Sequence, residues 1–306
     1  MSNFAAAMND NRQGMAAIIG FFDGVHKGHR HLAATLLAEA DRRGLSAMAV
    51  SFIQSPRQVL QPGWQPQLLT TPAERQRLLM EAGMERVAML DFTPELAQLT
   101  ARQFMRQVLA DRFDVRLLVV GYDTRFGHKR TETVSDYRRY GLEMGIEVVQ
   151  ATALEGCSSS AIRRLIADGE VERAAALLGR CYTIAGTVVH GFGNGRLLGF
   201  PTANVSPESN EKLLPASGAY ATCTRIDGGR WMPSMTDVGV RPTFHGSRLT
   251  VETHLLSGGG DFYGSRAEVM FCHWLRAERQ FGSQEELRRQ LQRDAERSAE
   301  LLTPVS

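Results

Sequence analysis

The pattern of the chain changes near residue 180, and this change constrains the fold more than any other feature. Before it, stretches with helical spacing alternate with five short apolar runs, at residues 16–20, 47–52, 86–90, 117–121 and 146–151. Strands that alternate with helices predict a parallel sheet, because parallel neighbours need a crossover connection. We therefore expect an α/β domain over residues 1–180, with phosphate-bearing ligands at the carboxyl ends of its strands.

After residue 180 the apolar runs follow one another without helices between them. Gly, Pro, Asn and Asp separate five segments of strand character, at residues 182–189, 218–226, 231–238, 249–256 and 267–275. This texture predicts an antiparallel sheet or a small antiparallel β-barrel over residues 181–306. A terminal helix is expected over residues 283–302, opened by a capping box of Ser283 and Glu286.

Helix boundaries in the first half carry clear signals. Thr71 is followed by Pro72 and, three residues on, by Glu74, and Thr100 is followed at the same offset by Gln103. Both pairs predict capping boxes, in which two backbone amides at a helix start are satisfied reciprocally. The residues from 159 to 178 also have helical character and lead up to the expected domain boundary.

Composition excludes several classes of protein. The 306 residues are 43% hydrophobic and 22% charged, which is ordinary for a globular protein of two domains. The net charge of +2 gives no general reason to expect nucleic acid or an anionic membrane as a partner. No signal peptide or apolar run of bilayer length is visible, and four widely spaced cysteines fit a reducing compartment. We expect a cytoplasmic protein, whose oligomeric state the sequence does not specify.

A glycine-rich motif, GFFDGVHKGH, occupies residues 20–29 between the first strand and the first helix. Backbone amides in such a turn approach a phosphate closely, and the helix N-terminus adds partial positive charge. His26 and His29 are placed to donate hydrogen bonds to the same anion. This arrangement suits displacement at a nucleotide α-phosphate, in which positioning and charge stabilisation do most of the work. A turn with two solvated histidines is the plainer alternative.

A second glycine-rich stretch, GTVVHGFGNGRLLGFPTAN, spans residues 186–204. Gly191 and Gly195 permit a loop whose amides fold around phosphates. Thr202 and Asn204 offer neutral oxygens, which suit Mg²⁺ held jointly with nucleotide phosphates. A glycine-rich hairpin followed by a proline turn is the plainer alternative.

The first half resembles one known family. Residues 20–29, 121–127 (GYDTRFG) and 158–163 (SSSAIR) are similar, in this order, to motifs of the prokaryotic bifunctional riboflavin kinase/FMN adenylyltransferases, also called FAD synthetases. The resemblance implies a nucleotidyltransferase-like Rossmann-type domain that carries the adenylyltransferase, with His26 and His29 as catalytic residues. It also implies nucleotide and phosphate binding by Gly20, Phe22, Asp23, Gly28, Gly121, Asp123, Ser158, Ser159 and Arg163.

The second half resembles the riboflavin kinase module of the same family. The similarity lies in GRLLGFPTAN at residues 195–204, GVRPTF at 239–244, VETHL at 251–255 and DFYG at 261–264. It implies that Glu252 is the general base for the riboflavin 5′-hydroxyl and that Thr202 and Asn204 hold Mg²⁺. It further implies nucleotide binding by Gly191, Gly195 and Arg196, and flavin binding by Arg241, Thr243 and Arg276.

The resemblance implies two ATP-dependent reactions: phosphorylation of riboflavin to FMN, then transfer of AMP to FMN, which yields FAD and pyrophosphate. Three residues depart from the family pattern: Ser55 stands where a histidine is usual, Asp237 where an asparagine is usual and Gln280 where a lysine is usual. These departures leave two alternatives open. One is a riboflavin kinase with a non-catalytic first domain, and the other is a regulatory protein that binds flavin or nucleotide without turnover.

Overall fold

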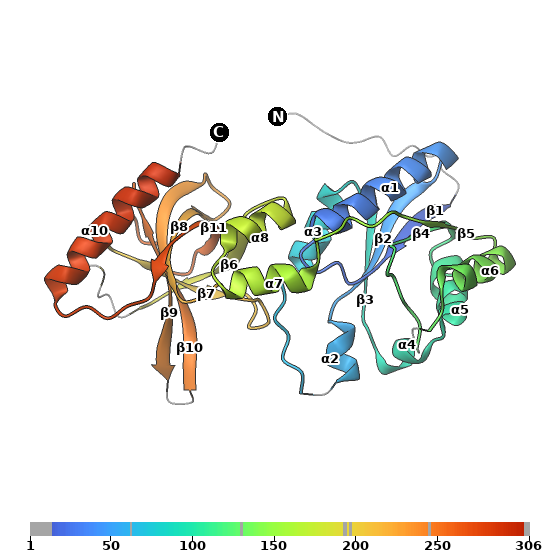
Figure 1. Ribbon diagram of the computed structural model, residues 1–306, viewed down its shortest axis with the longest axis horizontal. Coiled ribbons are helices and arrows are strands. Elements are labelled where there is room, and N and C mark those ends of the chain that lie inside the picture. The colour runs from blue at the N-terminus through green and yellow to red at the C-terminus, as the bar shows by residue number, and fades with distance from the viewer. Residues whose placement is uncertain are drawn as a thin grey trace. The chain divides into compact units, whose positions relative to one another are not determined.

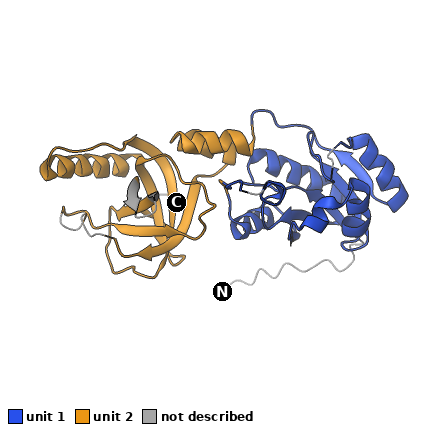
Figure 2. Ribbon diagram, turned by 90° about the horizontal axis from the view of Figure 1, so that it is seen from below, with its two compact units in different colours: residues 1–66, 70–156 blue, residues 67–69, 157–306 orange. Residues whose placement is uncertain are grey.

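The computed structural model describes residues 14–61, 63–128, 131–191, 195, 198–243 and 246–302, with the backbone alone at 240–243 and 246–249. The chain forms two compact units (Figure 2). The first comprises residues 1–66 and 70–156, and the second comprises residues 67–69 and 157–306. The compact units thus divide at residue 157, and the domain boundary expected at residue 180 stays a prediction.

The first unit is built on a five-stranded parallel sheet with the order β3-β2-β1-β4-β5 (Figure 1). Its strands are β1 (Met15–Ile19), β2 (Ser46–Phe52), β3 (Arg86–Leu90), β4 (Val115–Val120) and β5 (Glu147–Gln150). Each of the five predicted apolar runs forms one strand. The predicted α/β fold with a parallel sheet is confirmed.

Helices cover both faces of this sheet. Ala16 and Ile18 face one apolar cluster, which includes side chains of α1 (Lys27–Arg43) and α3 (Pro72–Glu81). Ala17 and Ile19 face the other, with α5 (Ala101–Phe104), the π-helical segment η1 (Met105–Ala110) and α6 (Val134–Met144). Because successive residues of a strand point to opposite faces, a strand covered on both sides is apolar throughout. Short helices α2 (Pro56–Leu60) and α4 (Pro94–Gln98) follow β2 and β3.

The helix caps follow the sequence signals in the first unit. Thr71 accepts a hydrogen bond from the Glu74 amide, and the Glu74 carboxylate accepts one from the Thr71 amide. Thr100 and Gln103 make the same reciprocal pair. Both predicted capping boxes are therefore confirmed.

The second unit contains a closed barrel of six strands in the order β10-β7-β6-β11-β8-β9. They are β6 (Tyr182–Val189), β7 (Ala203–Pro207), β8 (Gly218–Ile226), β9 (Met232–Thr243), β10 (Gly246–Leu255) and β11 (Arg266–Ala277). The predicted barrel and its terminal helix α10 (Gln284–Leu301) are confirmed. The sequence interpretation missed β7, because its proline-flanked residues look like a turn until β6 and β10 pair with them.

Two helix predictions need correction. The single helical stretch expected over residues 159–178 is two helices, α7 (Ser159–Ala167) and α8 (Val171–Leu178). They are broken at Gly169, whose φ is +81° and where a Cβ would lie 2.7 Å from the Trp274 ring. At α10 only half of the predicted capping box forms: Ser283 accepts from the Glu286 amide, but the Glu286 carboxylate accepts from Gly282 instead.

A layer of hydroxyl groups lies inside the barrel beside its apolar core. Thr222, Thr224, Ser234, Thr236 and Thr253 are all buried and bond to one another at 2.7–3.1 Å. Because each hydroxyl has a partner, these polar groups are tolerated in the interior. Thr253 of β10 therefore points into the barrel, and its neighbours along the strand point outward.

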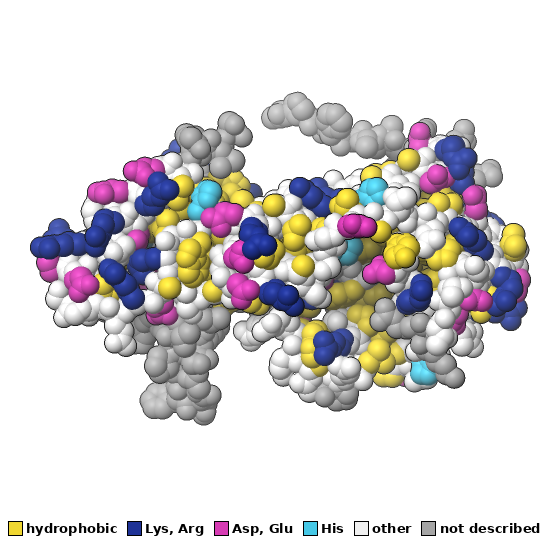
Figure 3. Space-filling view, in the orientation of Figure 1, with side chains coloured by type: hydrophobic (Ala, Val, Ile, Leu, Met, Phe, Trp, Pro, Cys, Tyr) yellow, Lys and Arg dark blue, Asp and Glu magenta, His cyan; other side chains and the backbone are white. Residues whose placement is uncertain are grey.

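The surface matches the nearly balanced charge of the chain. On the face shown in Figure 3, basic and acidic side chains lie interspersed over both units. Within the described residues, no helix has the length and apolar character that crossing a bilayer requires.

Candidate active sites

The motif at residues 20–29 lies at the carboxyl edge of the parallel sheet. β1 is paired on one side with β2 and on the other with β4, so the strand order reverses direction between β1 and β4. In open α/β sheets this switch point is where ligands bind, outside the carboxyl ends of the strands. The segment after β1 begins with Gly20 and that after β4 with Gly121, so the structure brings these two predicted segments to the same edge.

The turn after β1 has a strained backbone. Phe22 and Val25 have positive φ values of 54° and 39°, which are unusual for residues with a side chain. Gly20 is needed for close approach, since a Cβ there would lie 2.8 Å from the Phe22 ring. Strained residues of this kind persist only where the surrounding structure holds them, and they cluster at functional sites.

A buried carboxylate ties the turn to the start of α3. Asp23 is 2% exposed, and its Oδ1 accepts hydrogen bonds from the amide and the hydroxyl of Thr70, both at 3.0 Å. The Thr70 hydroxyl in turn accepts from the Gly24 amide at 3.0 Å. The structure therefore gives Asp23 a role in holding the turn, and sequence reasoning missed Thr70 as its partner.

The two histidines of the motif stack on each other. Their ring centroids are 3.6 Å apart, and His26 caps α1 by accepting from the His29 amide through Nδ1. The neutral His26 ring therefore carries its proton on Nε2. Burial, with a smaller contribution from the neighbouring His26, holds the pKa of His29 well below its usual range. His29 is thus a neutral imidazole at pH 7, suited to donate a hydrogen bond. Gly28 lies between the two, in the first turn of α1.

The segment after β4 forms its own shallow cleft. Gly121 donates from its amide to the Thr124 hydroxyl at 2.9 Å, which turns the chain back on itself. Asp123 is exposed and lines a cleft of about 430 Å³ together with Arg125, Arg138 and Gln150. The cleft combines one acidic and two basic side chains at the ligand-binding edge of the sheet.

The serine-rich motif starts helix α7 in the second unit. Ser158 caps the helix by accepting from the Ala161 amide at 3.2 Å, and Ser159 is its first residue. Arg163 donates from Nε to the carbonyl of Gln67 at 2.8 Å. That these residues join the phosphate site of the first unit stays a prediction.

In the barrel, three predicted or noted side chains stand in one row. Glu252 of β10 is paired directly with Asn204 of β7 on one side and with Asp237 of β9 on the other. Their chain neighbours Val251 and Val205 are buried inside the barrel. Because side chains alternate along a strand, the row lies on the outer face. Register alone thus places the predicted base beside a predicted metal ligand.

The glycine-rich loop begins over this row. A Cβ on Gly191 would lie 2.1 Å from Nδ2 of Asn204, so only glycine allows the backbone to lie this close to the Asn204 side chain. Gly195 has a similar constraint, because a Cβ there would lie 2.3 Å from the Phe200 carbonyl oxygen. Arg196 lies outside the described residues.

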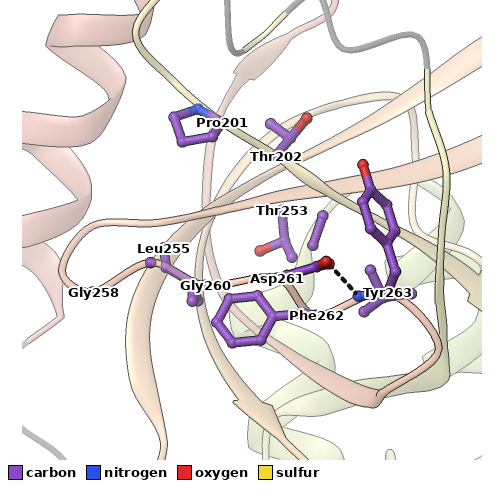
Figure 4. A pocket seen from close by; sticks show the side chains of 12 residues that line it. Pro201, Thr202, Thr253, Leu255, Gly258, Gly260, Asp261, Phe262 and Tyr263 are labelled. Atoms are coloured by element: carbon purple, nitrogen blue, oxygen red, sulfur yellow. Dashed lines mark hydrogen bonds between the residues drawn. The ribbon is translucent and has the colours of Figure 1, made fainter.

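Thr202 lines a pocket of about 400 Å³ at one end of the barrel. Figure 4 shows Thr202 and Pro201 on one side and Asp261, Phe262 and Tyr263 on another, with the Tyr263 amide donating to Asp261 at 3.2 Å. The pocket therefore combines an aromatic wall with hydroxyl and carboxylate oxygens. Phe262 and Tyr263 had no site role assigned from sequence, although the DFYG motif that contains them was noticed.

The donor set fits Mg²⁺. Asn204 and Glu252 offer an amide and a carboxylate oxygen side by side, and Thr202 offers a hydroxyl two residues away in the chain. Mg²⁺ is usually held by one or two carboxylates together with substrate phosphates and water. No cluster of three His, Cys, Asp or Glu suited to a metal occurs in the part of the chain that the structure describes. These residues would therefore hold the ion together with a nucleotide.

Comparison with known proteins decides the family. Residues 8–162 match the FAD synthetase family model, and residues 178–302 match the riboflavin kinase model. The bifunctional riboflavin kinase/FMN adenylyltransferase of Escherichia coli K12 is 36% identical over 92% of this chain and 91% of its own. The chain belongs to this family.

Other relatives agree over the whole length. The bifunctional riboflavin kinase/FMN adenylyltransferase of Pseudomonas fluorescens is 35% identical over 97% of this chain and 96% of its own. A crystal structure described as a macrolide-efflux protein from Streptococcus pneumoniae matches with a TM-score of 0.86 and 31% identity, covering 94% of each chain. The family has both modules, so the first unit and the barrel correspond to one reaction each.

Two residues that depart from the family pattern, Ser55 and Asp237, can be located in the structure. Ser55 is the N-cap of α2, where it accepts from the Arg57 amide and its own amide donates to Gln58. Asp237 faces Glu252 across the β9–β10 pair. Ser55 therefore supports a local helix start, whereas Asp237 adds a second carboxylate next to the predicted base.

Of the three predicted flavin-binding residues, the structure describes the side chain of Arg276 alone. Arg276 donates to Asp294 of α10 at 2.9 Å and so fastens that helix to β11. Arg241 and Thr243 belong to β9, but their side chains lie outside the described residues. Flavin binding by all three stays a prediction.

Proposed function

We propose that the two reactions of the family are divided between the sites described above. The barrel row around Glu252 phosphorylates riboflavin to FMN, and the turn around His26 and His29 directs the transfer of AMP from ATP to FMN. The observation that supports this division is that each unit holds groups suited to one of the two chemistries. A base beside metal-ligand oxygens suits phosphorylation of a hydroxyl, and neutral donors at a helix N-terminus suit displacement at a phosphate.

In the kinase step, Glu252 takes the proton of the riboflavin 5′-hydroxyl as the oxygen attacks the γ-phosphorus of ATP, and the bond to the bridging oxygen breaks so that ADP leaves. Asn204 and Thr202 would hold Mg²⁺, which supplies charge neutralisation between the phosphates when bound. Gly191 and Gly195 contribute to phosphate binding, and the pocket beside Thr202 takes the nucleoside. Aromatic side chains such as Tyr263 at the rim suit a planar base.

In the adenylylation step, a phosphate oxygen of FMN attacks the α-phosphorus of ATP and pyrophosphate leaves. No group of the protein bonds to the phosphorus. His26 donates from Nε2, and neutral His29 donates without the cost of burying a charge, while the helix start of α1 stabilises the negative charge. By their resemblance to the serine-rich motif of the family, Ser158 and Arg163 are proposed to bind nucleotide phosphate. We also propose a cytoplasmic location, because the four cysteines are widely spaced in the sequence, which fits a reducing compartment.

One incubation tests the proposal. The full chain is mixed with riboflavin, ATP and Mg²⁺, and flavins are separated by chromatography over time, with parallel samples in EDTA or with FMN in place of riboflavin. We expect FMN to appear first and then to give way to FAD, with neither formed in EDTA. FMN that accumulates without FAD would refute a catalytic role for the first unit, and unchanged riboflavin would refute the kinase assignment.

A further inference from the structure

Helix α3 carries an arginine in an unusual environment. Arg75 is 0% exposed, although arginine is almost never fully buried unless it is paired. Its Nη2 donates to the carbonyls of Phe52 and Ile53 at the end of β2, the latter at 3.1 Å. Nε and Nη1 are also buried, and among the described residues they have no hydrogen-bond partner. Two donors are thus buried without the compensation that folded proteins normally provide.

Packing alone does not explain this side chain. Burial lowers the pKa of Arg75 to about 10, offset only in part by the Asp23 carboxylate, so the group remains a cation at neutral pH. Burying a charge costs free energy unless the charge is paired and fully hydrogen-bonded, and two donors of this guanidinium have no partner among the described residues. The charge therefore calls for a functional reason.

The contacts of Arg75 point to the strained turn after β1. Its guanidinium carbon lies 4.2 Å from the centroid of the Phe21 ring, a cation–π contact. Phe21 directly precedes Phe22, which is one of the two non-glycine residues of this turn with positive φ. Helix α3 therefore supports the turn twice: through Thr70, which binds Asp23 just before the helix starts, and through Arg75 one turn further along.

We propose that Arg75 is a positioning residue for adenylyl transfer. Its cation holds Phe21, fixes the strained turn and so keeps His26 and His29 in the geometry that receives the phosphates. It also places a fixed positive charge behind the turn, where the negative charge of two phosphorylated substrates collects. This inference rests on the proposed function of the turn, and it adds a residue that neither touches substrate nor belongs to the recognised motifs.

The test compares three variants of the full chain: Arg75→Met, Arg75→Lys and, as a matched control, Arg77→Met. Arg77 lies on the same helix but is exposed and pairs with Glu81. For each, kcat and KM are measured for adenylylation of added FMN, together with the kinase rate and the thermal unfolding midpoint. We expect Arg75→Met to lower the adenylylation kcat by about 10²-fold, because small misplacements of catalytic groups have effects of this size. Its kinase rate should stay at the wild-type value, and the unfolding midpoint shows whether the variant is folded at the assay temperature.

Arg75→Lys keeps the charge and should recover about tenfold of the lost kcat, whereas Arg77→Met should behave as wild type. A fourth variant, Phe21→Leu, keeps the apolar contact but removes the ring, and combining it with Arg75→Met should lower kcat no further than Arg75→Met alone. Should Arg75→Met fold poorly, Phe21→Leu alone decides the test: its adenylylation kcat should fall while its kinase rate stays at the wild-type value, and an unchanged kcat would overturn the inference.

The inference is overturned by a wild-type kcat in Arg75→Met, by a lysine variant no better than methionine, or by losses of Phe21→Leu and Arg75→Met that simply multiply. The proposed function fails separately, when the wild-type chain itself makes no FAD. Wild-type FAD synthesis together with a fully active Arg75→Met chain would leave the proposed function intact and refute only the role of Arg75.

Discussion

The turn of the first unit and the row on the barrel position their chemistry in different ways. On the barrel, Asn204, Glu252 and Asp237 come from three strands and are placed by register. In the turn, His26 and His29 follow a backbone that contains two strained residues and depends on supports from α3. A register is shared by many hydrogen bonds, whereas a strained turn depends on a few contacts. We therefore expect the barrel site to respond mainly to changes of its own side chains, and the turn to respond also to changes behind it.

The sharpest test of this comparison is a reciprocal pair of substitutions. Glu252→Gln removes the base but keeps the shape, so riboflavin phosphorylation should fall by about 10²- to 10⁴-fold while adenylylation of added FMN continues. His29→Ala should lower adenylylation by about 10²- to 10³-fold and leave the kinase unchanged. Rates of both reactions are measured on each variant. A folded variant that loses both activities would contradict the division of labour.

A core substitution tests whether residues 67–69 stabilise the second unit. Leu69 is 1% exposed and packs in the barrel cluster, although it lies in the sequence between two parts of the first unit. Leu69→Ala should lower the free energy of unfolding of the kinase unit by about 2–5 kcal/mol. Urea unfolding followed by kinase activity and by adenylylation activity separates the two units. Leu60→Ala, at an exposed site, is the matched control.

The contact between the glycine-rich loop and Asn204 sharpens the barrel half of the comparison. Gly191→Ala places a methyl group 2.1 Å from Nδ2 of Asn204, so the loop or the amide must move. We expect the kinase rate to fall by about 10- to 10²-fold, with adenylylation unaffected. In Gly282→Ala the nearest atom lies at an ordinary 3.5 Å, and this variant should retain full kinase activity. Equal rates in the two variants would show that the loop does not depend on this contact.

The smallest expected effect concerns pH. His29 titrates near pH 6.5 when unfolded, but its pKa is lowered in the folded first unit by burial. The unfolded chain therefore binds the proton more readily. Stability attributable to His29 is full above about pH 6.5 and falls as the pH drops toward the folded pKa, by at most about 1.4 kcal/mol per pH unit. His29→Gln should show a shallower loss of first-unit stability between pH 7 and 5. Stability is measured by urea unfolding. The unfolding is followed through FMN adenylylation in the wild type and through tyrosine and tryptophan fluorescence in the wild type and the variant. An unchanged slope would contradict it.

Much of the architecture could be predicted from the sequence, because it depends on local patterns. Apolar runs and capping boxes such as Thr71–Glu74 are read within a few residues, and the resemblance of the motif around Glu252 predicts a base there without knowledge of the register. The supports of the turn could not be predicted. Asp23 meets Thr70 across 47 residues of sequence, and Arg75 looks like a surface residue of an amphipathic helix until packing buries it. Strand β7 was missed for the related reason that only its partners make it a strand.

The closure of the barrel has a consequence for how the protein is made. β6 pairs with β11, so the barrel cannot close until residues near the end of the chain have been synthesised. All five strands of the parallel sheet precede residue 151, and domains begin to fold during synthesis from the N-terminus. On the ribosome, the unit for the second reaction is therefore complete first. Under the proposed division of the two reactions, the nascent chain would complete the parallel sheet of the unit that consumes FMN before the barrel that makes it.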